Sequence, residues 1–428
     1  MEEEKEQKVK EKLSYYGQEI KRDVGNLVKW LFLAVVVGCV TGAASTLFSF
    51  ALKGVTAYRK ANEWIFFLLP VMGLIIVFLY EKIGKEDGGT NQVLSTVRSQ
   101  DDVPLLSAPL IFISTALTHL AGGSAGREGA AIQLGGSIAN QLGRWIHLDE
   151  EDRHVIVMCG MSAAFSALFG TPMAAAVFAL EVVSVGVMYY TALMPCMIAS
   201  LIASQFAAGM GVTPESFHVV DIPALSLETG LKMVIVAVGC AVVSIIFCMV
   251  LNAVAGLYAK WLKNPYIRVV VGACLVIAVT LLLRTDEYMG SGAELIAKAV
   301  ETGQTDTLAF LWKIILTALT MRAGFRGGEI VPSFCVGATF GCVMGNLLGL
   351  SPSICAACGM AAVFCGVTNC PITSILIAFE MFGFRGVSFY LIAVSISYAA
   401  SGYYGLYKNQ TIVYSKYKAK YVNRHTRF

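Results

Sequence analysis

The stretch Ala121-Gly-Gly-Ser-Ala-Gly-Arg-Glu-Gly-Ala-Ala-Ile-Gln-Leu134 places two charged side chains, Arg127 and Glu128, between glycines in an otherwise apolar part of the chain. Ionisable groups are costly to bury in lipid, so such residues commonly line an ion pathway or contact a bound ion. The glycines lead into an apolar segment typical of a helix, and free backbone N–H groups at a helix start bind anions. The stretch therefore predicts an anion site beside a carboxylate that can carry a proton.

The composition indicates a membrane protein. Of 428 residues, 56% are hydrophobic and 14% are charged, whereas soluble proteins carry about 25% charged residues. The uncharged runs Leu31–Leu52 and Met233–Ala259 are each long enough to cross a bilayer. The uncharged run Ile330–Phe379 is too long for one span, and we expect its prolines to break it: Pro332, Pro352 and Pro371. Because lipid cannot satisfy open backbone groups, the expected fold is an all-α polytopic membrane protein.

The two ends of the chain differ in charge. Residues 1–23 carry charges of both signs and are expected to form an amphipathic surface segment, not a signal peptide. The segment after Tyr407 is rich in lysine and arginine. Basic segments next to spans tend to remain in the cytoplasm. We therefore expect a multi-pass protein of the inner (plasma) membrane with both termini cytoplasmic.

The chain also contains an internal repeat. Cys159-Gly-Met and Cys358-Gly-Met lie 199 residues apart (358 − 159), and the same offset pairs Pro172 with Pro371 and Glu181 with Glu380. Because only one copy of that glutamate could serve a given proton route, its symmetric recurrence favours an architectural role. The predicted organisation is an N-terminal segment, a first membrane repeat, a linker, a second membrane repeat and a basic tail, at residues 1–23, 24–213, 214–227, 228–407 and 408–428.

Three glycine-marked segments are expected to start helices. They are Gly88-Gly89-Thr90-Asn91, Ser124–Gly129 and Gly327–Pro332, and in the last of them Pro332 suits a first helical turn. Membrane repeats often build their site near the midplane, where broken helices from both halves meet. If the three starts converge, their N–H groups and dipoles would favour a negative ion there.

At these residues the chain resembles the CLC family of anion channels and proton-coupled anion antiporters. Gly126-Arg-Glu-Gly129 is similar to the family's gating-glutamate motif, and Gly328-Glu-Ile-Val-Pro332 to its second anion-binding loop. Gly405-Leu-Tyr407 resembles the late segment that brings a tyrosine hydroxyl to the pore. The resemblance runs from about Val24 to Gln410. It implies two inverted-topology repeats with re-entrant helices, and a homodimer with one pore in each subunit.

The chain differs from the sequence motifs of chloride-handling family members at several positions. Ala130 replaces the proline that follows the gating motif in most chloride-handling members, and Gly89–Val93 reads Gly-Thr-Asn-Gln-Val instead of Gly-Ser-Gly-x-Pro. Glu329 adds an acid to the second loop. Val182 occupies the position that resembles the inner proton glutamate of chloride/proton antiporters. Together these departures resemble the fluoride-exporting branch of the family.

The resemblance assigns roles to individual residues. Glu128 is the expected gate and proton carrier, and Glu329 is a candidate second acidic pore residue. The expected anion-binding residues are Gly89, Thr90, Asn91, Arg127, Gly129, Ala130, Ile330, Val331 and Tyr407.

Several of these assignments have alternatives. Arg127 could pair structurally with a carboxylate or with loop carbonyls. Glu329 could pair with Arg322 or Arg326, or take part in proton transfer. Thr90 and Asn91 could be ordinary helix caps. Tyr407 could belong to an interfacial tyrosine belt.

The expected function is proton-coupled fluoride export across the bilayer, with fluoride or chloride and protons as the transported ions. The alternative is a chloride channel or a chloride/proton antiporter of the same family.

A membrane enzyme is disfavoured because no nucleophile, metal set or cofactor motif accompanies Glu128 and Glu329. No cofactor, metal or nucleic acid is expected, and Cys355 and Cys358 are interpreted as small packing residues. A structural scaffold would not need charges at membrane depth.

Overall fold

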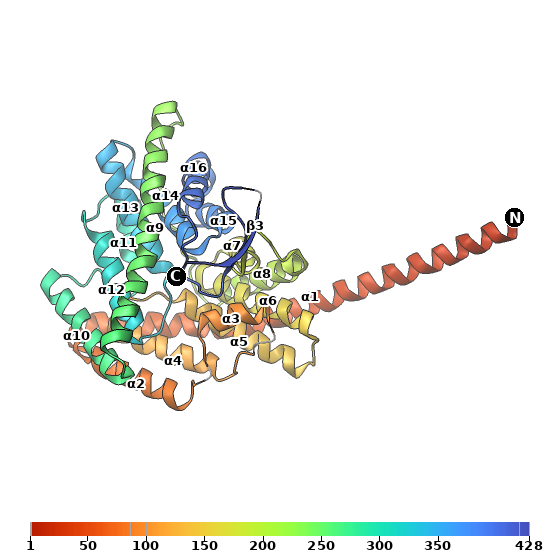
Figure 1. Ribbon diagram of the computed structural model, residues 1–428, viewed down its shortest axis with the longest axis horizontal. Helices are drawn as coiled ribbons and strands as arrows, with labels where there is room; N and C mark the ends of the chain where they lie inside the picture. The colour runs from red at the N-terminus through yellow and green to blue at the C-terminus, as the bar shows by residue number, and fades with distance from the viewer. Residues whose placement is uncertain (1, 86, 100–101, 419, 428) are drawn as a thin grey trace.

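The computed structural model describes residues 2–85, 87–99, 102–418 and 420–427, and most of its regular structure is helical (Figure 1). The helices are α1 (Glu2–Ala61), α2 (Leu69–Lys82), α3 (Thr90–Thr96), α4 (Ser107–Leu120), α5 (Glu128–Trp145), α6 (Glu150–Phe169), α7 (Pro172–Glu181), α8 (Leu193–Gly209), α9 (Leu227–Trp261), α10 (Pro265–Leu283), α11 (Ala293–Ala297), α12 (Ala309–Ala323), α13 (Ile330–Leu348), α14 (Pro352–Thr368), α15 (Pro371–Phe382) and α16 (Val387–Ala400). Short 3-10 or π turns lie at η1 (Glu63–Leu68), η2 (Tyr190–Ala192), η3 (Lys298–Thr302) and η4 (Phe384–Gly386).

The chain is a polytopic membrane protein by the length and composition of its helices. Among the described residues, six helices or helix pairs are long and apolar enough to cross a bilayer: Ser14–Ala61, Glu63–Lys82, Tyr190–Gly209, Leu227–Trp261, Pro265–Leu283 and Ile330–Leu348. The two predicted spans lie within α1 and α9, which confirms them. The long run after Glu329 is divided as expected at Pro352 and Pro371, which begin α14 and α15. Pro332 lies in the first turn of α13, as expected, where a missing N–H is tolerated.

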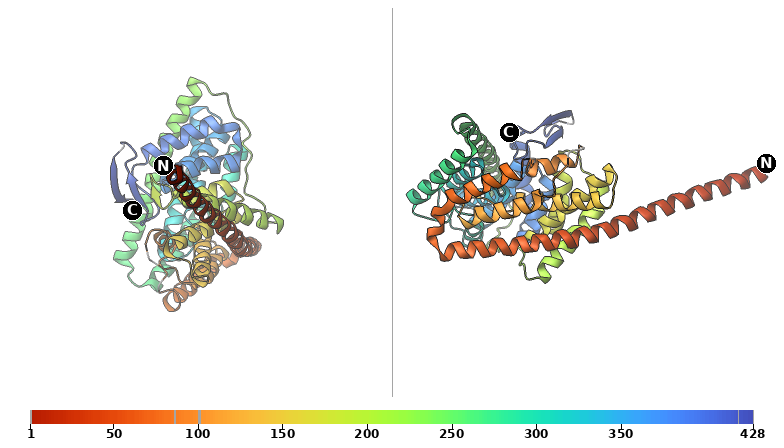
Figure 2. Two further views of the ribbon diagram at one scale, coloured as in Figure 1. Left: turned by 90° about the vertical axis from the view of Figure 1, so that its right-hand side faces the viewer. Right: turned by 90° about the horizontal axis from the view of Figure 1, so that it is seen from below.

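Helix α1 is continuous and projects from the rest of the molecule (Figures 1 and 2). Its C-terminal part packs against α6 and α8, whereas its N-terminal part extends away from the body. Tyr15, Tyr16 and Ile20 are exposed on this extension. The expected surface segment is therefore the first part of the same helix that continues as the first span.

The two halves contain an equivalent helix crossing. A side chain on Gly135 would begin 2.2 Å from the carbonyl oxygen of Gly160, and one on Gly337 would begin 2.3 Å from that of Gly359. Backbones in such close contact need glycine on both helices. Gly160 and Gly359 are the glycines of the two Cys-Gly-Met motifs. The sequence repeat therefore marks where α6 crosses α5 and where α14 crosses α13.

Helices α7 and α15 cap each other across the two halves. The Glu380 carboxylate accepts hydrogen bonds from the backbone N–H groups of Met173 and the residue after it, both at 2.9 Å. In return, the Glu181 carboxylate accepts one from the N–H of Ile372 at 3.1 Å and two from the N–H and hydroxyl of Thr373, at 2.9 and 2.6 Å. Free N–H groups at helix starts need such partners. The architectural role expected for the symmetric glutamates is confirmed.

The C-terminal residues fold back onto the end of the first half. Strands β2 (Thr411–Tyr414) and β3 (Tyr421–His425) form an antiparallel pair, and β2 also pairs in parallel with β1 (Ser184–Val185). This small sheet lies at the edge of the helical body (Figure 2). The Asn409 side chain donates to the carbonyl of Asn91 at 3.0 Å, within α3. The basic tail thus contains a β-hairpin that is tied to α3.

Candidate functional site

The starts of α5 and α13 meet at a bridge between the two halves. The N–H of Gly126 donates to the carbonyl of Gly328 at 2.7 Å, and the N–H of Gly328 donates to that of Gly126 at 2.8 Å. A side chain on Gly328 would begin 2.7 Å from the backbone nitrogen of Gly129. One on Gly126 would begin 2.9 Å from Cδ of Pro332. The bridge therefore requires glycine at both positions.

Helix α3 joins this junction from a third direction. Gly89 precedes it with φ +69°, a backbone conformation that suits glycine. The Thr90 hydroxyl donates to the carbonyl of Gly129 at 3.2 Å. The expected convergence of the three glycine-marked helix starts is confirmed.

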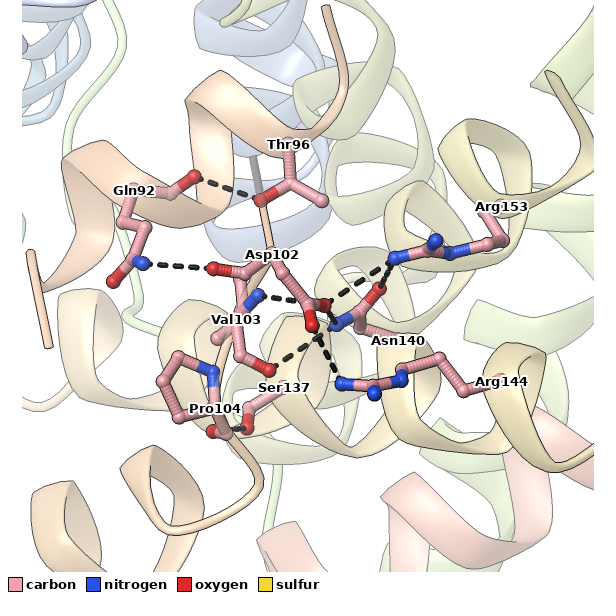
Figure 3. A network of polar contacts seen from close by, with 9 residues as sticks. All are labelled: Gln92, Thr96, Asp102, Val103, Pro104, Ser137, Asn140, Arg144 and Arg153. Atoms are coloured by element: carbon pink, nitrogen blue, oxygen red, sulfur yellow. Dashed lines mark hydrogen bonds and ion pairs between the residues drawn. The ribbon is translucent and has the colours of Figure 1, made fainter. Parts of the chain in front are cut away.

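A polar network anchors the loop that follows α3 (Figure 3). The Asp102 carboxylate accepts hydrogen bonds from the Asn140 amide at 2.7 Å and from the Arg144 and Arg153 guanidinium groups at 2.5 and 3.3 Å. The side-chain amide of Gln92, in α3, donates to the Asp102 carbonyl at 2.7 Å. The sequence analysis missed this network, because Asp102 is one acid in a polar loop and no local pattern singles it out.

Glu128 is fully buried at the junction. Its carboxylate accepts hydrogen bonds from the backbone N–H groups of Arg127 at 2.9 Å and Val331 at 3.1 Å. These groups belong to the starts of α5 and α13, where the helix dipoles favour negative charge. The carboxylate therefore occupies backbone N–H groups of the kind that bind anions at helix starts.

Two cavities lie beside the junction of the helix starts. The first, of about 160 Å³, is lined by Gly88, Gly89, Thr90, Asn91, Ile111, Gly129, Gln133, Met321, Arg322, Phe325, Arg326, Gly327, Gly328, Glu329, Leu406 and Tyr407. The second, of about 300 Å³, is lined by Leu52, Lys53, Thr56, Ala57, Lys60, His119, Arg127, Glu215, Ser291 and Ala293. Gly129 faces the first cavity and Arg127 the second. Glu128 lies between these two residues in the chain, and its Oε2 lies 2.6 Å from the point where a side chain on Gly328, a residue that lines the first cavity, would begin.

The predicted anion-binding residues lie in three places, and one of them, Arg127, lines the second cavity. Five line the first cavity, as does Glu329: Gly89, Thr90, Asn91, Gly129 and Tyr407. Ala130, Ile330 and Val331 are instead buried in the first turns of α5 and α13. Val331 reaches the site through its backbone N–H, which binds the gate carboxylate. The sequence analysis did not propose the cavity-lining residues Arg326 and Gln133 as anion-site residues, because neither belongs to a recognised motif.

Tyr407 lines the first cavity and does not face the surface, since only 6% of the residue is exposed. The Thr426 hydroxyl donates to its carbonyl at 2.7 Å, which holds the backbone here against the C-terminal strand region. No other described residue forms a hydrogen bond with the Tyr407 hydroxyl. This hydroxyl is therefore available to a ligand in the cavity.

Arg127 and Glu329 both have ion-pair partners. The Arg127 guanidinium pairs with Glu215 of the linker, and its central carbon lies 5.7 Å from the centre of the Phe169 ring. The Glu329 carboxylate lies 2.9 Å from Arg322. These contacts favour the structural alternative for both side chains, while Arg127 still contributes its backbone N–H to the gate.

The position that resembles an inner proton glutamate has no titratable side chain. Val182 is buried at the end of α7, and its carbonyl accepts a hydrogen bond from the Gln410 side-chain amide at 2.8 Å. Among the described residues, no group of three or more histidine, cysteine, aspartate or glutamate side chains is placed to hold a metal ion. Cys355 and Cys358 are free and buried, as expected for packing residues.

Comparisons with known proteins identify relatives over most of the chain. A family model described as voltage gated chloride channel matches residues 72–402. A chloride/fluoride channel protein of Pseudomonas syringae pv. tomato is 34% identical over 401 residues, covering 91% of this chain and 88% of the relative. The H(+)/Cl(-) exchange transporter ClcA of Vibrio cholerae is 25% identical over 393 residues, covering 82% of this chain and 81% of the relative.

Solved structures show the same architecture. The crystal structure of a CLC-type fluoride/proton antiporter superimposes with a TM-score of 0.86 at 34% identity, covering 90% of this chain and 98% of that one. A slow cyanobacterial Cl-/H+ antiporter shares the fold, with a TM-score of 0.77 at 18% identity and coverage of 87% of this chain and 94% of that one.

Proposed function

Because the chain belongs to the voltage gated chloride channel (CLC) family of anion transporters, we propose that it exports fluoride in exchange for protons. Glu128 serves as both gate and proton carrier. The observation that carries this proposal is the position of its buried carboxylate, which accepts hydrogen bonds from N–H groups at two helix starts.

The proposed mechanism is competition for one site. While it is ionised, the Glu128 carboxylate occupies the N–H groups at the starts of α5 and α13 and excludes an anion. Protonation removes its charge, so the side chain leaves and an anion takes its place. The side chain then releases its proton to the other side, and the ionised carboxylate returns to the N–H groups and expels the anion. Anion and proton therefore move in opposite directions through the same gate.

Fluoride as the anion is supported by the donors around the first cavity. A pore for a small, strongly hydrated anion must replace its water with hydrogen-bond donors. The Tyr407 hydroxyl and the amide of Asn91 face this cavity, and neither side chain makes a hydrogen bond to another described residue. The relatives named for fluoride, both 34% identical, support the same choice.

The alternative is a chloride channel or a chloride/proton antiporter. Val331 supports it, because an apolar side chain stands where a hydroxyl would serve fluoride better. The 25% identical ClcA relative exchanges chloride for protons, according to its name.

Efflux from liposomes tests the proposal. Purified protein is reconstituted in vesicles loaded with equal concentrations of fluoride and chloride salts, and each anion is followed with a selective electrode while external pH is recorded. We expect fluoride efflux well above chloride efflux, with pH dependence and inward proton movement. Expression should also let a fluoride-sensitive bacterium grow in added fluoride. Equal efflux of both anions without growth rescue would refute the fluoride assignment and favour the alternative.

We also propose the assembly and orientation that the resemblance implies. The chain pairs as a homodimer with one pore in each subunit, in the inner (plasma) membrane. The mixed-charge start of α1 and the basic C-terminal segment support a cytoplasmic position for both termini. Residues 24–213 and 228–407 act as the two membrane repeats.

A further inference from the structure

Among the described residues, the cavity beside the gate is lined by one more positive than negative side chain. These are two arginines, Arg322 and Arg326, and one carboxylate, that of Glu329. Glu329 pairs with Arg322 at 2.9 Å. Arg326 forms no ion pair with a described residue, and its Nε has no hydrogen-bond partner. One guanidinium in this cavity therefore has no ion-pair partner among the described residues.

Two contacts hold Arg326 in place. Its guanidinium carbon lies 3.8 Å from the centre of the Tyr80 ring, a cation–π contact. Its backbone N–H donates to the Thr118 hydroxyl at 3.3 Å. Stacking on a ring positions the guanidinium plane without using its N–H groups. The donors of Arg326 therefore remain free for a ligand.

The side chain points toward the start of α3. Its Nη1 lies 3.8 Å from the point where a side chain on Gly89 would begin. The neighbouring acid Asp87 is engaged with other groups, since its carboxylate accepts hydrogen bonds from the Gly89 N–H at 2.9 Å and from the Gln133 amide at 2.8 Å. No ion pair joins Asp87 to Arg326 among the described contacts. A glycine here leaves room beside the guanidinium.

We propose that Arg326 is a further anion-binding residue, on which the transported anion docks in the cavity before it reaches the site held by Glu128. This inference rests on the proposed function. Arg326 is half-buried and its Nε is shielded from water without a partner, so an anion that enters the cavity offers this donor an acceptor and the guanidinium a counter-charge. Hydrogen bonds between an ionised donor and an ionised acceptor are stronger than neutral ones. The sequence analysis had considered Arg326 only as a partner for Glu329, and Arg322 fills that role.

The test compares Arg326→Gln with Arg326→Lys and with a matched control, Arg385→Gln. Arg385 lines a separate cavity with Ser388 and Phe389, and its replacement removes the same charge. Initial fluoride efflux is measured over a range of internal fluoride concentrations. For Arg326→Gln we expect the half-saturating concentration to rise roughly tenfold, the scale of one hydrogen bond to a charged group, with a maximal rate close to the parent's. Arg326→Lys should shift it less, and the control should match the parent.

Binding calorimetry on purified protein separates this inference from the proposed function. Fluoride and chloride are titrated into the parent and into Arg326→Gln. If the parent moves neither anion in liposomes, the transport proposal fails, yet weaker anion binding by the variant still supports Arg326. If the parent prefers chloride, the same comparison is made with chloride. Unchanged affinity together with unchanged concentration dependence overturns the role of Arg326.

A third variant covers the case in which Arg326→Gln does not elute as a folded protein. Arg326→Cys is treated with a methanethiosulfonate reagent that attaches either an ammonium or a sulfonate group, with the parent treated in parallel because it contains twelve native cysteines. The attached cation should restore transport at low fluoride concentration, whereas the attached anion should not. Equal effects of the two reagents would contradict the need for a positive charge at this position.

Discussion

A carboxylate meets helix starts at two junctions between the halves, and the two junctions differ. At the α7–α15 junction the arrangement is reciprocal, because Glu181 caps α15 and Glu380 caps α7. At the α5–α13 junction a single carboxylate, that of Glu128, binds N–H groups from both halves. The symmetric Gly126–Gly328 bridge places Ile330 at the position equivalent to Glu128. One junction is therefore symmetric, and the other is not.

The difference indicates which carboxylate can exchange with an anion. At α7–α15 each glutamate binds the helix start of the other half, and neither lines a cavity described above. The Glu128 carboxylate instead lies against Gly328, which lines the first cavity, so that cavity can supply an anion to the same N–H groups. A symmetric pair of caps fixes the two halves together, whereas an unpaired cap can be displaced. The following predictions test this distinction.

The largest effect is expected from Glu128→Gln. The amide cannot carry a titrating proton, so proton movement driven by an anion gradient should be abolished. Proton uptake is measured in vesicles with a pH electrode, and Glu151→Gln, on the exposed surface at the start of α6, serves as the control. Proton pumping by Glu128→Gln at the parent rate would remove Glu128 from the mechanism.

Glu181→Ala should reduce stability while preserving coupling. The change leaves three donors at the start of α15 without their acceptor, which we expect to lower the free energy of unfolding by about 3 kcal/mol or more. Glu380→Ala leaves two donors and should have a smaller effect. Unfolding midpoints in detergent measure the loss. A changed proton-to-anion ratio in the folded fraction of Glu181→Ala would show that this junction is not purely architectural.

Tyr407→Phe removes one hydroxyl and little volume. If this hydroxyl contacts the anion, its loss should weaken binding by roughly 1.5–3 kcal/mol, the range for a hydrogen bond to a charged group. Anion affinity is measured by calorimetry, and Tyr404→Phe, from the same C-terminal region, is the control. Unchanged affinity and flux would place Tyr407 outside the anion path.

The smallest effect is expected from Asn409→Ala, which removes the side-chain hydrogen bonds between the segment preceding the C-terminal hairpin and α3. The variant loses hydrogen bonds to the Asn91 carbonyl and the Ser95 hydroxyl, together worth about 1–2 kcal/mol of stability. Efflux should slow modestly, because α3 carries Thr90 and Asn91 into the first cavity. The exposed Lys418→Ala is the control. An unchanged rate and unfolding midpoint would mean that the hairpin does not help position α3.

The sequence predicted much of the fold and the gate because the relevant signals are local. Uncharged runs predicted the spans in α1 and α9, and glycines predicted the helix starts at Gly89, Gly126 and Gly328. The Cys-Gly-Met repeat predicted two related halves. Pro332 lies in a first helical turn, as its position after the glycines indicated, because a proline there replaces an N–H that needs no partner.

What the sequence by itself determined was the membrane class, the internal repeat and the acid in the gate loop, since hydrophobic run length, a constant offset and a charge among glycines are all visible along the chain. Only the tertiary structure decided which groups these residues contact. The pairing of Glu329 with Arg322 instead of Arg326, the exchange of caps between Glu181 and Glu380, and the return of the C-terminal hairpin to α3 depend on it. Two of these contacts join residues roughly 200 or more positions apart in the chain, and in all three several partners of the same chemistry are available. Packing of the two halves selects one partner from each set.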